Sequence, residues 1–259
     1  MVRDAHYRAK LAHRARGLRE LDARVGGITA DIDARLQRTR VVRILELGCG
    51  YGTALLELRA RYGNRVELHG LNRFPDDGNA EILGRNAADH QIFQSAAVHA
   101  RELPRIAYGD IAGGLPYPDD HFDIVFSQVA WLYFGRKLDV LREIVRVLRG
   151  DGLAKIDADE LRPALPAEYA RLVEIWNGGA LVPFADYVAR HGMALTAAPE
   201  GSYLRFGKVA SIAADVEPLF EIDLATINDD WDGIKCVYRL RPQPPETPRD
   251  PRAAGDRET

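Results

Sequence analysis

Apolar and polar positions along the chain follow two alternating periods. Short apolar runs of strand type, each bounded by polar or turn residues, occupy 41–47, 66–71, 105–108, 122–127 and 153–156. Segments whose apolar residues recur every third or fourth position precede or separate these runs, at 3–24, 28–36, around 55–58, 78–89, 92–101 and 136–149. Side chains alternate with a period of two residues in a strand and of 3.6 residues in a helix, which distinguishes the two kinds of segment. Regular alternation of strands and helices predicts a parallel sheet with helices on both faces.

Beyond residue 157 the alternation becomes less regular. Two helices and four strands are predicted there, at 166–176 and 184–191 and at 194–198, 203–209, 219–227 and 235–240. The turn residues at 199–202 (PEGS) predict a hairpin between the first two of these strands. The last 18 residues contain five prolines and no apolar residue larger than alanine, so we expect a disordered tail at 242–259.

Composition narrows the class of protein without naming a function. The 259 residues carry 35 Lys and Arg against 38 Asp and Glu, and 46% are hydrophobic, as in soluble globular proteins. The near-neutral balance argues against a dedicated nucleic-acid binder, and no apolar run is long enough to cross a membrane. Two cysteines and the charged first residues favour a cytoplasmic protein without a disulfide framework. The seven histidines show no metal-binding spacing, so no metal is expected.

The strongest local signal is the segment ILELGCGYG at 44–52, where a predicted strand runs into closely spaced glycines and then a helix. Such a loop lets the backbone approach a ligand, and the helix start offers free N–H groups. The spacing differs from that of dinucleotide and phosphate loops, and the loop carries no Lys or Arg for a pyrophosphate. Glu46 instead sets a carboxylate beside the loop, which suits a ligand with an ammonium group.

Three segments together resemble the class I S-adenosylmethionine-dependent methyltransferases, specifically a type-11-like methyltransferase domain. ELGCGYG resembles the first motif of that family, GDIAGGLPYPDDHFDIVFSQ its third and fourth strands, and LREIVRVLRGDGLAKID its last helix and fifth strand. The resemblance covers about 41–158. With the alternation above, it predicts a Rossmann-like sheet of seven mostly parallel strands in the order 3-2-1-4-5-7-6. One of the runs beyond residue 200 is expected to supply the antiparallel strand, and 235–240 is the favoured one. We expect an N-terminal helical extension at 1–40, a methyltransferase domain at 41–241 with additional C-terminal strands, and the tail.

The resemblance implies S-adenosyl-L-methionine as cofactor and S-adenosyl-L-homocysteine as product. Glu46 would then contact the methionine amino group, and Asp110 and the Ile111 amide would read the adenine, unless Asp110 only caps a turn. Ser127 and Gln128 would face the transferred methyl group, although Gln128 also reads as ordinary surface. The loop residues that would underlie the methionine and ribose are Gly48, Cys49, Gly50 and Gly52.

One position departs from the family pattern. The second strand of these enzymes ends in an acidic residue that holds the ribose hydroxyls, whereas this chain has Asn72. A side-chain amide offers one acceptor oxygen and a donor, so a ribose contact remains open but the charge-assisted bond is lost. Alternatively, Asn72 reflects a changed ligand, for example one with extra negative charge that Arg73 reads. In a third possibility, Asn72 turns away and Asp76 or Asp77 takes over its role.

Catalytic residues are not identified by any motif. Trp131, Tyr133 and Phe134 follow the fourth strand, where they either wall an acceptor pocket or pack a helix on the sheet. Asp157 at the end of the fifth strand is a candidate base or a helix cap.

The leading interpretation is a methyltransferase for a small-molecule acceptor, a metabolite or a natural product, in a monomer or homodimer. Two alternatives remain: a peptide or protein methyltransferase, and a protein that binds S-adenosylmethionine without methylating, such as a rearrangement enzyme.

Overall fold

The structure is a computed structural model of the 259-residue chain. It describes residues 16–93, 102–131, 134, 137–158, 174–177, 180–208, 220–222 and 238–240. Most of the helix expected at 92–101, the first part of the helix expected at 3–24, and the tail at 242–259 lie outside the described residues.

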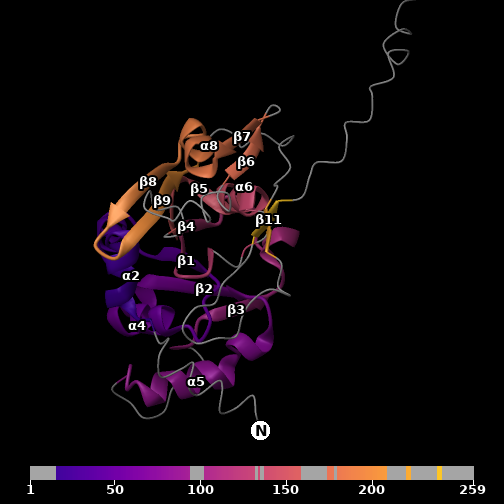
Figure 1. The fold of residues 1–259 in the computed structure, drawn as a ribbon. Coiled ribbons are helices and arrows are strands. Elements are labelled where there is room, and N and C mark those ends of the chain that lie inside the picture. The colour runs from indigo at the N-terminus through magenta and orange to yellow at the C-terminus, as the bar shows by residue number, and fades with distance from the viewer. Residues whose placement is uncertain are drawn as a thin grey trace, which may run out of the picture.

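A seven-stranded sheet forms the centre of the molecule (Figure 1). Its strands lie in the order β3-β2-β1-β4-β5-β9-β8. The bounds are β1 Val42–Leu47, β2 Val66–Asn72, β3 Arg105–Tyr108, β4 Phe122–Ser127, β5 Leu148–Asp157, β8 Ala194–Ala198 and β9 Gly201–Gly207. Neighbours among β1 to β5 are parallel, and β9 is antiparallel to both β5 and β8. The predicted fold class and strand order are confirmed.

A run beyond residue 200 supplies the antiparallel strand, as predicted, but the favoured segment 235–240 is wrong. That strand is β9, formed by the hairpin with β8 that the turn at 199–202 predicts, and not the segment 235–240. Tyr238–Leu240 is β11, which among the described residues pairs with β10 (Phe220–Ile222) in a separate two-stranded sheet. The tight turn pairs β9 with its neighbour β8, and β9 lies between β5 and the edge strand β8.

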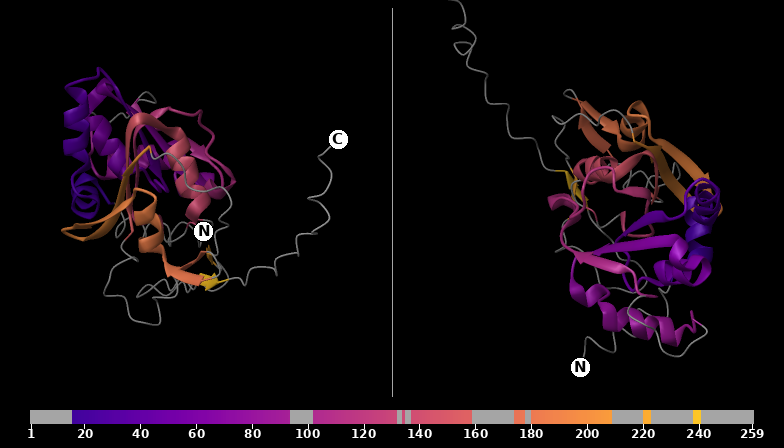
Figure 2. Two further views of the ribbon diagram at one scale, coloured as in Figure 1. Left: turned by 90° about the horizontal axis from the view of Figure 1, so that it is seen from above. Right: turned by 180° about the vertical axis from the view of Figure 1, so that it is seen from behind.

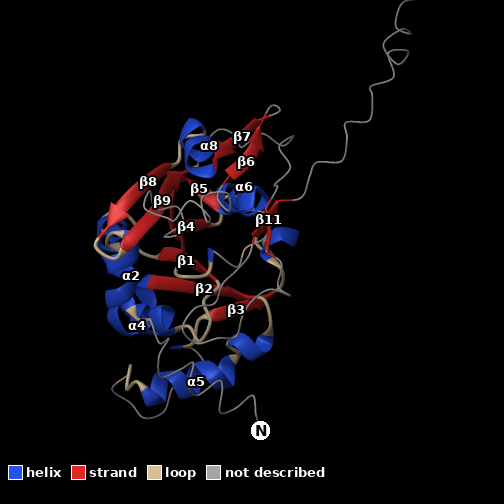
Figure 3. Cartoon of the chain, in the orientation of Figure 1, coloured by secondary structure: helices blue, strands red, loops and turns tan. Residues whose placement is uncertain are grey.

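Helices cover both faces of the sheet, as Figures 2 and 3 show. On one face lie α2 (Leu18–Val25), α3 (Ile28–Leu36) and α4 (Thr53–Tyr62), whose apolar residues share a core with β1 and β4. On the other face, α6 (Lys137–Val147) and α8 (Phe184–Arg190) contribute to a second core. Helix α5 (Ala80–Asp89) contacts α4.

The remaining elements are short. They are the 3-10 turns η1 (Gly63–Arg65), η2 (Pro75–Asp77) and η4 (Ile111–Gly113), and the strands β6 (Glu174–Asn177) and β7 (Ala180–Pro183). Of the helix predicted at 166–176, only 174–176 lies within the described residues, and it is strand instead: Ile175 and Trp176 pair with β7. β-branched and aromatic residues favour such pairing.

Charged side chains attach the N-terminal helices to the sheet. Lys155 of β5 is 3% exposed, and its ammonium group forms an ion pair with Asp31 at 2.5 Å and donates to the Gly26 carbonyl at 2.9 Å. A buried ammonium ion needs such partners, since desolvation otherwise costs several kcal/mol. Helices α2 and α3 therefore pack on the same sheet as the segment after residue 41, and the boundary at residue 40 stays a prediction. Within the described part of the chain, no helix has the length and apolarity of a membrane span.

Candidate active site

The glycine loop connects β1 to α4 at the carboxyl edge of the sheet. Gly48, Gly50 and Gly52 have φ values of 70°, 51° and 68°, in the left-handed region that other residues rarely adopt. The N–H groups of Gly48 and Cys49 both donate to the Leu71 carbonyl, at 2.8 and 3.2 Å, which ties the loop to the end of β2. A Cβ at Gly50 would meet no atom within 4 Å, so the loop borders open space there.

Two side-chain amides hold this loop in place. Asn72 accepts from the Gly50 N–H at 2.8 Å and donates to the Gly50 carbonyl at 2.9 Å. On the other side, Asn86 of α5 donates to the Tyr51 carbonyl at 2.9 Å and contacts the Thr53 hydroxyl at 2.8 Å. The structure therefore directs the Asn72 amide to the loop, in contrast to the ribose-facing position expected from the sequence.

Asn86 is absent from the residues expected at the site. Its signal is an amide on the buried face of α5, between Leu83 and Ala87. A polar residue at an apolar position of an amphipathic helix calls for a buried partner.

Glu46, the next-to-last residue of β1, is buried against the loop with 4% exposure. Among the described residues its Oε2 atom has no hydrogen-bond partner. Burial raises the pKa of this carboxyl well above its ordinary value, and burial followed by the charge of Glu46 raises that of the Cys49 thiol. A buried carboxylate of this kind gains most from a cationic ligand.

Gln128 follows β4 directly and is 7% exposed. Its Nε2 atom also has no hydrogen-bond partner within the described chain. Because Glu46 pairs with Phe126 in the sheet, Gln128 lies two residues further toward the same edge. By contrast, the Ser127 hydroxyl donates to the Leu47 carbonyl at 2.9 Å and is fully buried, so it ties β4 to β1.

Asp157 ends β5 beside these residues and is 3% exposed. Its Oδ2 atom accepts from the Val129 N–H at 3.1 Å and lies 3.4 Å from the Arg24 guanidinium. Val129 has φ 54°, a strained conformation for a β-branched residue. The contacts of Asp157 favour a positioning role over that of a base, and Arg24 is a residue that no sequence signal singled out.

Two of the three aromatic candidates lie in the hydrophobic core, and the third is outside the described residues. Trp131 is fully buried, and its ring packs edge-on to Phe134 with centroids 5.9 Å apart in the core under α6. This placement favours packing over an acceptor pocket. Tyr133 lies outside the described residues.

Exposed groups gather where β2 and β3 end. Asp110 is 61% exposed and lies 4.0 Å from Arg73, and Ile111 beside it is buried at the start of η4. Phe74 and Tyr108 are the exposed large apolar side chains of the described chain, at 56% and 39%. Aromatic rings exposed beside a carboxylate suit a flat, hydrogen-bonding ring such as a nucleobase.

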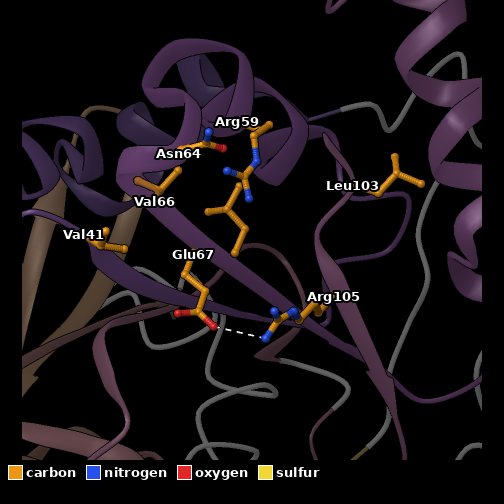
Figure 4. A pocket seen from close by; sticks show the side chains of 8 residues that line it. Val41, Arg59, Asn64, Val66, Glu67, Leu103 and Arg105 are labelled. Atoms are coloured by element: carbon orange, nitrogen blue, oxygen red, sulfur yellow. Dashed lines mark hydrogen bonds and ion pairs between the residues drawn. The ribbon is translucent and has the colours of Figure 1, made fainter. Parts of the chain in front are cut away.

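A cavity of about 440 Å³ opens elsewhere, at the amino ends of β2 and β3 (Figure 4). Its lining residues are Val41, Arg59, Asn64, Val66, Glu67, Leu68, Leu103 and Arg105. The Glu67 carboxylate forms an ion pair with Arg105 at 3.2 Å. None of the candidate site residues lines this cavity, since they lie at the opposite edge of the sheet.

Comparisons with known proteins agree with this geometry. Residues 45–156 match the family model described as a methyltransferase domain. The glycine/sarcosine/dimethylglycine N-methyltransferase of Actinopolyspora halophila is 34% identical over 42% of this chain, and the match spans 17% of that enzyme. The 27-O-demethylrifamycin SV methyltransferase of Amycolatopsis mediterranei is 26% identical over 58% of this chain and 51% of that enzyme. The chain thus matches about half or less of the length of these relatives.

Part of the chain is also similar to solved structures. A protein of Methanococcus maripaludis described as a candidate S-adenosyl-L-methionine-dependent methyltransferase covers 71% of this chain and 85% of its own, at 17% identity and a TM-score of 0.44. The family match therefore identifies residues 45–156 as a methyltransferase domain, and the observed strand order is the one predicted for it.

Proposed function

We propose that the protein is an S-adenosylmethionine-dependent methyltransferase that acts on a small-molecule acceptor. The observation that carries the proposal is the pair Glu46 and Gln128. One offers a buried acceptor atom and the other a buried donor atom, both without partners in the described chain and both at the glycine-loop edge. A ligand with an ammonium and a carboxylate group, as in the amino-acid end of S-adenosylmethionine, satisfies both.

Different residues of the site bind different parts of such a cofactor. Glu46 binds the ammonium group, Gln128 donates to the carboxylate, and the open side of Gly50 lets the backbone approach the ligand. Asp110, whose carboxylate lies 4.0 Å from the Arg73 guanidinium, accepts from the adenine amine. When bound, S-adenosylmethionine supplies a methyl group on a positively charged sulfur, which leaves as a neutral thioether. The protein then has mainly to hold the acceptor in line with that methyl group, and needs no nucleophile of its own.

Two observations support a small-molecule acceptor. The two curated relatives act, by their names, on glycine derivatives and on a rifamycin, both small molecules. A chain with formal charge −3 also offers no general attraction for nucleic acid. A metabolite or natural product is therefore the proposed acceptor, and residues 1–35 and 160–235 are the segments expected to select it.

Calorimetric titration with two ligands tests the cofactor part of the proposal. S-adenosylhomocysteine carries the amino-acid end, whereas 5′-methylthioadenosine lacks it. We expect the wild type to prefer S-adenosylhomocysteine by at least about tenfold, since an ammonium–carboxylate bond contributes 1.5–3 kcal/mol. Glu46→Gln should remove most of that preference.

Glu81→Gln is the matched control, because Glu81 is exposed on α5 and pairs only locally with Arg85. Equal affinity of the wild type for the two ligands contradicts the assignment of Glu46. Incubation with methyl-labelled S-adenosylmethionine and panels of small molecules and peptides then tests the acceptor. Cofactor binding without any labelled product, on every panel, favours the non-methylating alternative.

A further inference from the structure

Asn72 makes a reciprocal pair of hydrogen bonds with a single residue of the glycine loop. Its Oδ1 atom accepts from the Gly50 N–H and its Nδ2 atom donates to the Gly50 carbonyl, at 2.8 and 2.9 Å. The side chain is 3% exposed, and the Cys49 thiol lies 3.4 Å from the same Oδ1 atom. A primary amide matches both backbone groups of one residue, because it presents a donor and an acceptor side by side.

The turn after β2 covers the remaining face of this pair. A Cβ added to Gly78 would lie 2.0 Å from the Gly50 carbonyl oxygen and 2.8 Å from Asn72 Nδ2. Only a glycine therefore lets the turn close over both groups. The Tyr108 hydroxyl donates to the Gly78 carbonyl at 3.3 Å and holds the turn from the other side. Both polar atoms of the Asn72 amide are thus engaged by Gly50, in a side chain that is 3% exposed.

We infer that Asn72 is a positioning residue, which fixes the left-handed Gly50 peptide, and that the cofactor site discriminates weakly at the ribose. The inference rests on the proposed function for its ligand, but the role of Asn72 in the loop does not. An acidic residue in this place offers two acceptor oxygens to a pair of ribose hydroxyls. Here both polar atoms of the Asn72 side chain are bonded to Gly50. The ligand is therefore recognised mainly at its two ends, by Glu46 and by Asp110.

An aspartate cannot replace this amide in its ionised form. The carboxylate of Asn72→Asp still accepts from the Gly50 N–H, but its second oxygen then faces the Gly50 carbonyl oxygen without a proton between them. When protonated, the same carboxyl donates to that carbonyl and restores the pair. The defect of the variant is therefore expected to depend on pH, which simple loss of packing does not explain.

Thermal unfolding and S-adenosylhomocysteine titration of Asn72→Asp and wild type, between pH 5 and 8, test the role in the loop. We expect the variant to have a lower melting temperature and at least about tenfold weaker binding at pH 8. Both differences from the wild type should narrow toward pH 5. Tighter binding by the variant at neutral pH, or a difference in melting temperature that stays constant with pH, overturns the inference.

Other charged groups near Asn72 are the same in both proteins. Glu46 and Asp77 both act on the adjacent Cys49 thiol, Tyr108 contacts the covering turn, and Arg73 is the next residue. The wild type measured at each pH removes their titration from the comparison. Asn79→Asp is a matched control, because Asn79 caps α5 through its oxygen, which accepts from the Ile82 N–H, and aspartate caps equally well. That control should show no such pH dependence.

A second measurement needs no variant. The wild type is titrated with S-adenosylhomocysteine and with its 2′-deoxyribose analogue. We expect the two affinities to agree within about threefold, whereas a hydrogen bond to a charged acceptor would separate them by tenfold or more. A tenfold loss overturns the inference on the ribose. Absence of binding by both ligands refutes the proposed function, and the unfolding data on Asn72→Asp still decide the role in the loop.

Discussion

Arg24 of α2 lies 3.4 Å from Asp157 at the end of β5, and the same carboxylate oxygen accepts from the Val129 N–H. One carboxylate thus joins three parts of the chain that are distant in sequence. It holds Val129 at φ 54°, directly after Gln128, and so fixes the turn that follows β4. The N-terminal helix thereby helps to shape the carboxyl edge of the sheet.

Asp157→Asn and Asp157→Ala separate the two roles considered for this residue. The amide keeps an acceptor for the Val129 N–H, so Asp157→Asn should retain most of the methyl-transfer rate. Alanine leaves a buried N–H and Arg24 without this partner, and it should lower the free energy of unfolding by about 2–4 kcal/mol. Urea denaturation and turnover with labelled cofactor measure the two effects. If Asp157 is instead the base, both variants lose turnover alike.

Asp151→Asn provides the control for that series. Asp151 lies on the same strand, pairs with Arg35 at 3.3 Å, and has a side chain that is 75% exposed. Exposed ion pairs contribute little, so the change in unfolding free energy should stay within about 0.5–1 kcal/mol.

Glu46 connects stability with pH. Burial raises its pKa in the folded protein above the value of 4.5, so the folded state binds more protons than the unfolded state at this group. Its contribution to stability is therefore full below pH 4.5 and is lost as the pH rises through the folded-state pKa. Glu46→Gln has no such group, and at pH 8 without ligand it should melt higher than the wild type, by about 2–4 °C for each kcal/mol gained.

The same comparison at several pH values gives the sign of the effect. The advantage of Glu46→Gln in melting temperature should shrink as the pH falls toward 4.5. Saturating S-adenosylhomocysteine should reverse the order at pH 8, because its ammonium group stabilises the ionised carboxylate only in the wild type. A variant that is less stable than the ligand-free wild type at pH 8 contradicts the account.

The fold followed from local patterns because each strand and helix of 42–157 has its own periodic signal. Strands β1 and β4 lie at the predicted residues, and the family resemblance supplied the strand order. The antiparallel strand was misplaced because 203–209 and 235–240 are similar apolar runs. Only the hairpin turn at 199–202 distinguishes them, and its consequence for the sheet edge depends on packing.

The roles of the site residues are harder to predict from the sequence than the fold, because each role depends on the direction of the side chain. Glu46 and the glycines were recognisable from one motif. The direction of the Asn72 amide depends on where Gly50 lies, and the ion pair of Arg24 with Asp157 joins residues 133 apart. No local pattern encodes such contacts.

Asp110→Ala tests recognition at the base end. The variant should bind S-adenosylhomocysteine about 1–3 kcal/mol more weakly, since the adenine amine loses its acceptor. The wild type should also bind an analogue without that amine more weakly, whereas the variant should not distinguish the two ligands. Because Asp110 is 61% exposed and pairs with Arg73 only at 4.0 Å, stability should barely change. Discrimination between the ligands that survives in Asp110→Ala removes the residue from the site.

Gly48 and Gly50 are expected to fail in different ways when substituted. A Cβ at Gly48 would lie 2.4 Å from the Cβ of Ala130, whereas a Cβ at Gly50 would meet no atom within 4 Å. Both residues have positive φ, so either alanine variant carries about 1–2 kcal/mol of backbone strain. Gly48→Ala adds a clash inside the protein and should destabilise the fold strongly.

Gly50→Ala should cost only the strain, yet its methyl group enters the space proposed for the ligand. Melting temperature and S-adenosylhomocysteine affinity, measured on both variants, separate these effects. If Gly50→Ala binds the ligand as tightly as wild type, the cofactor does not approach the loop at Gly50.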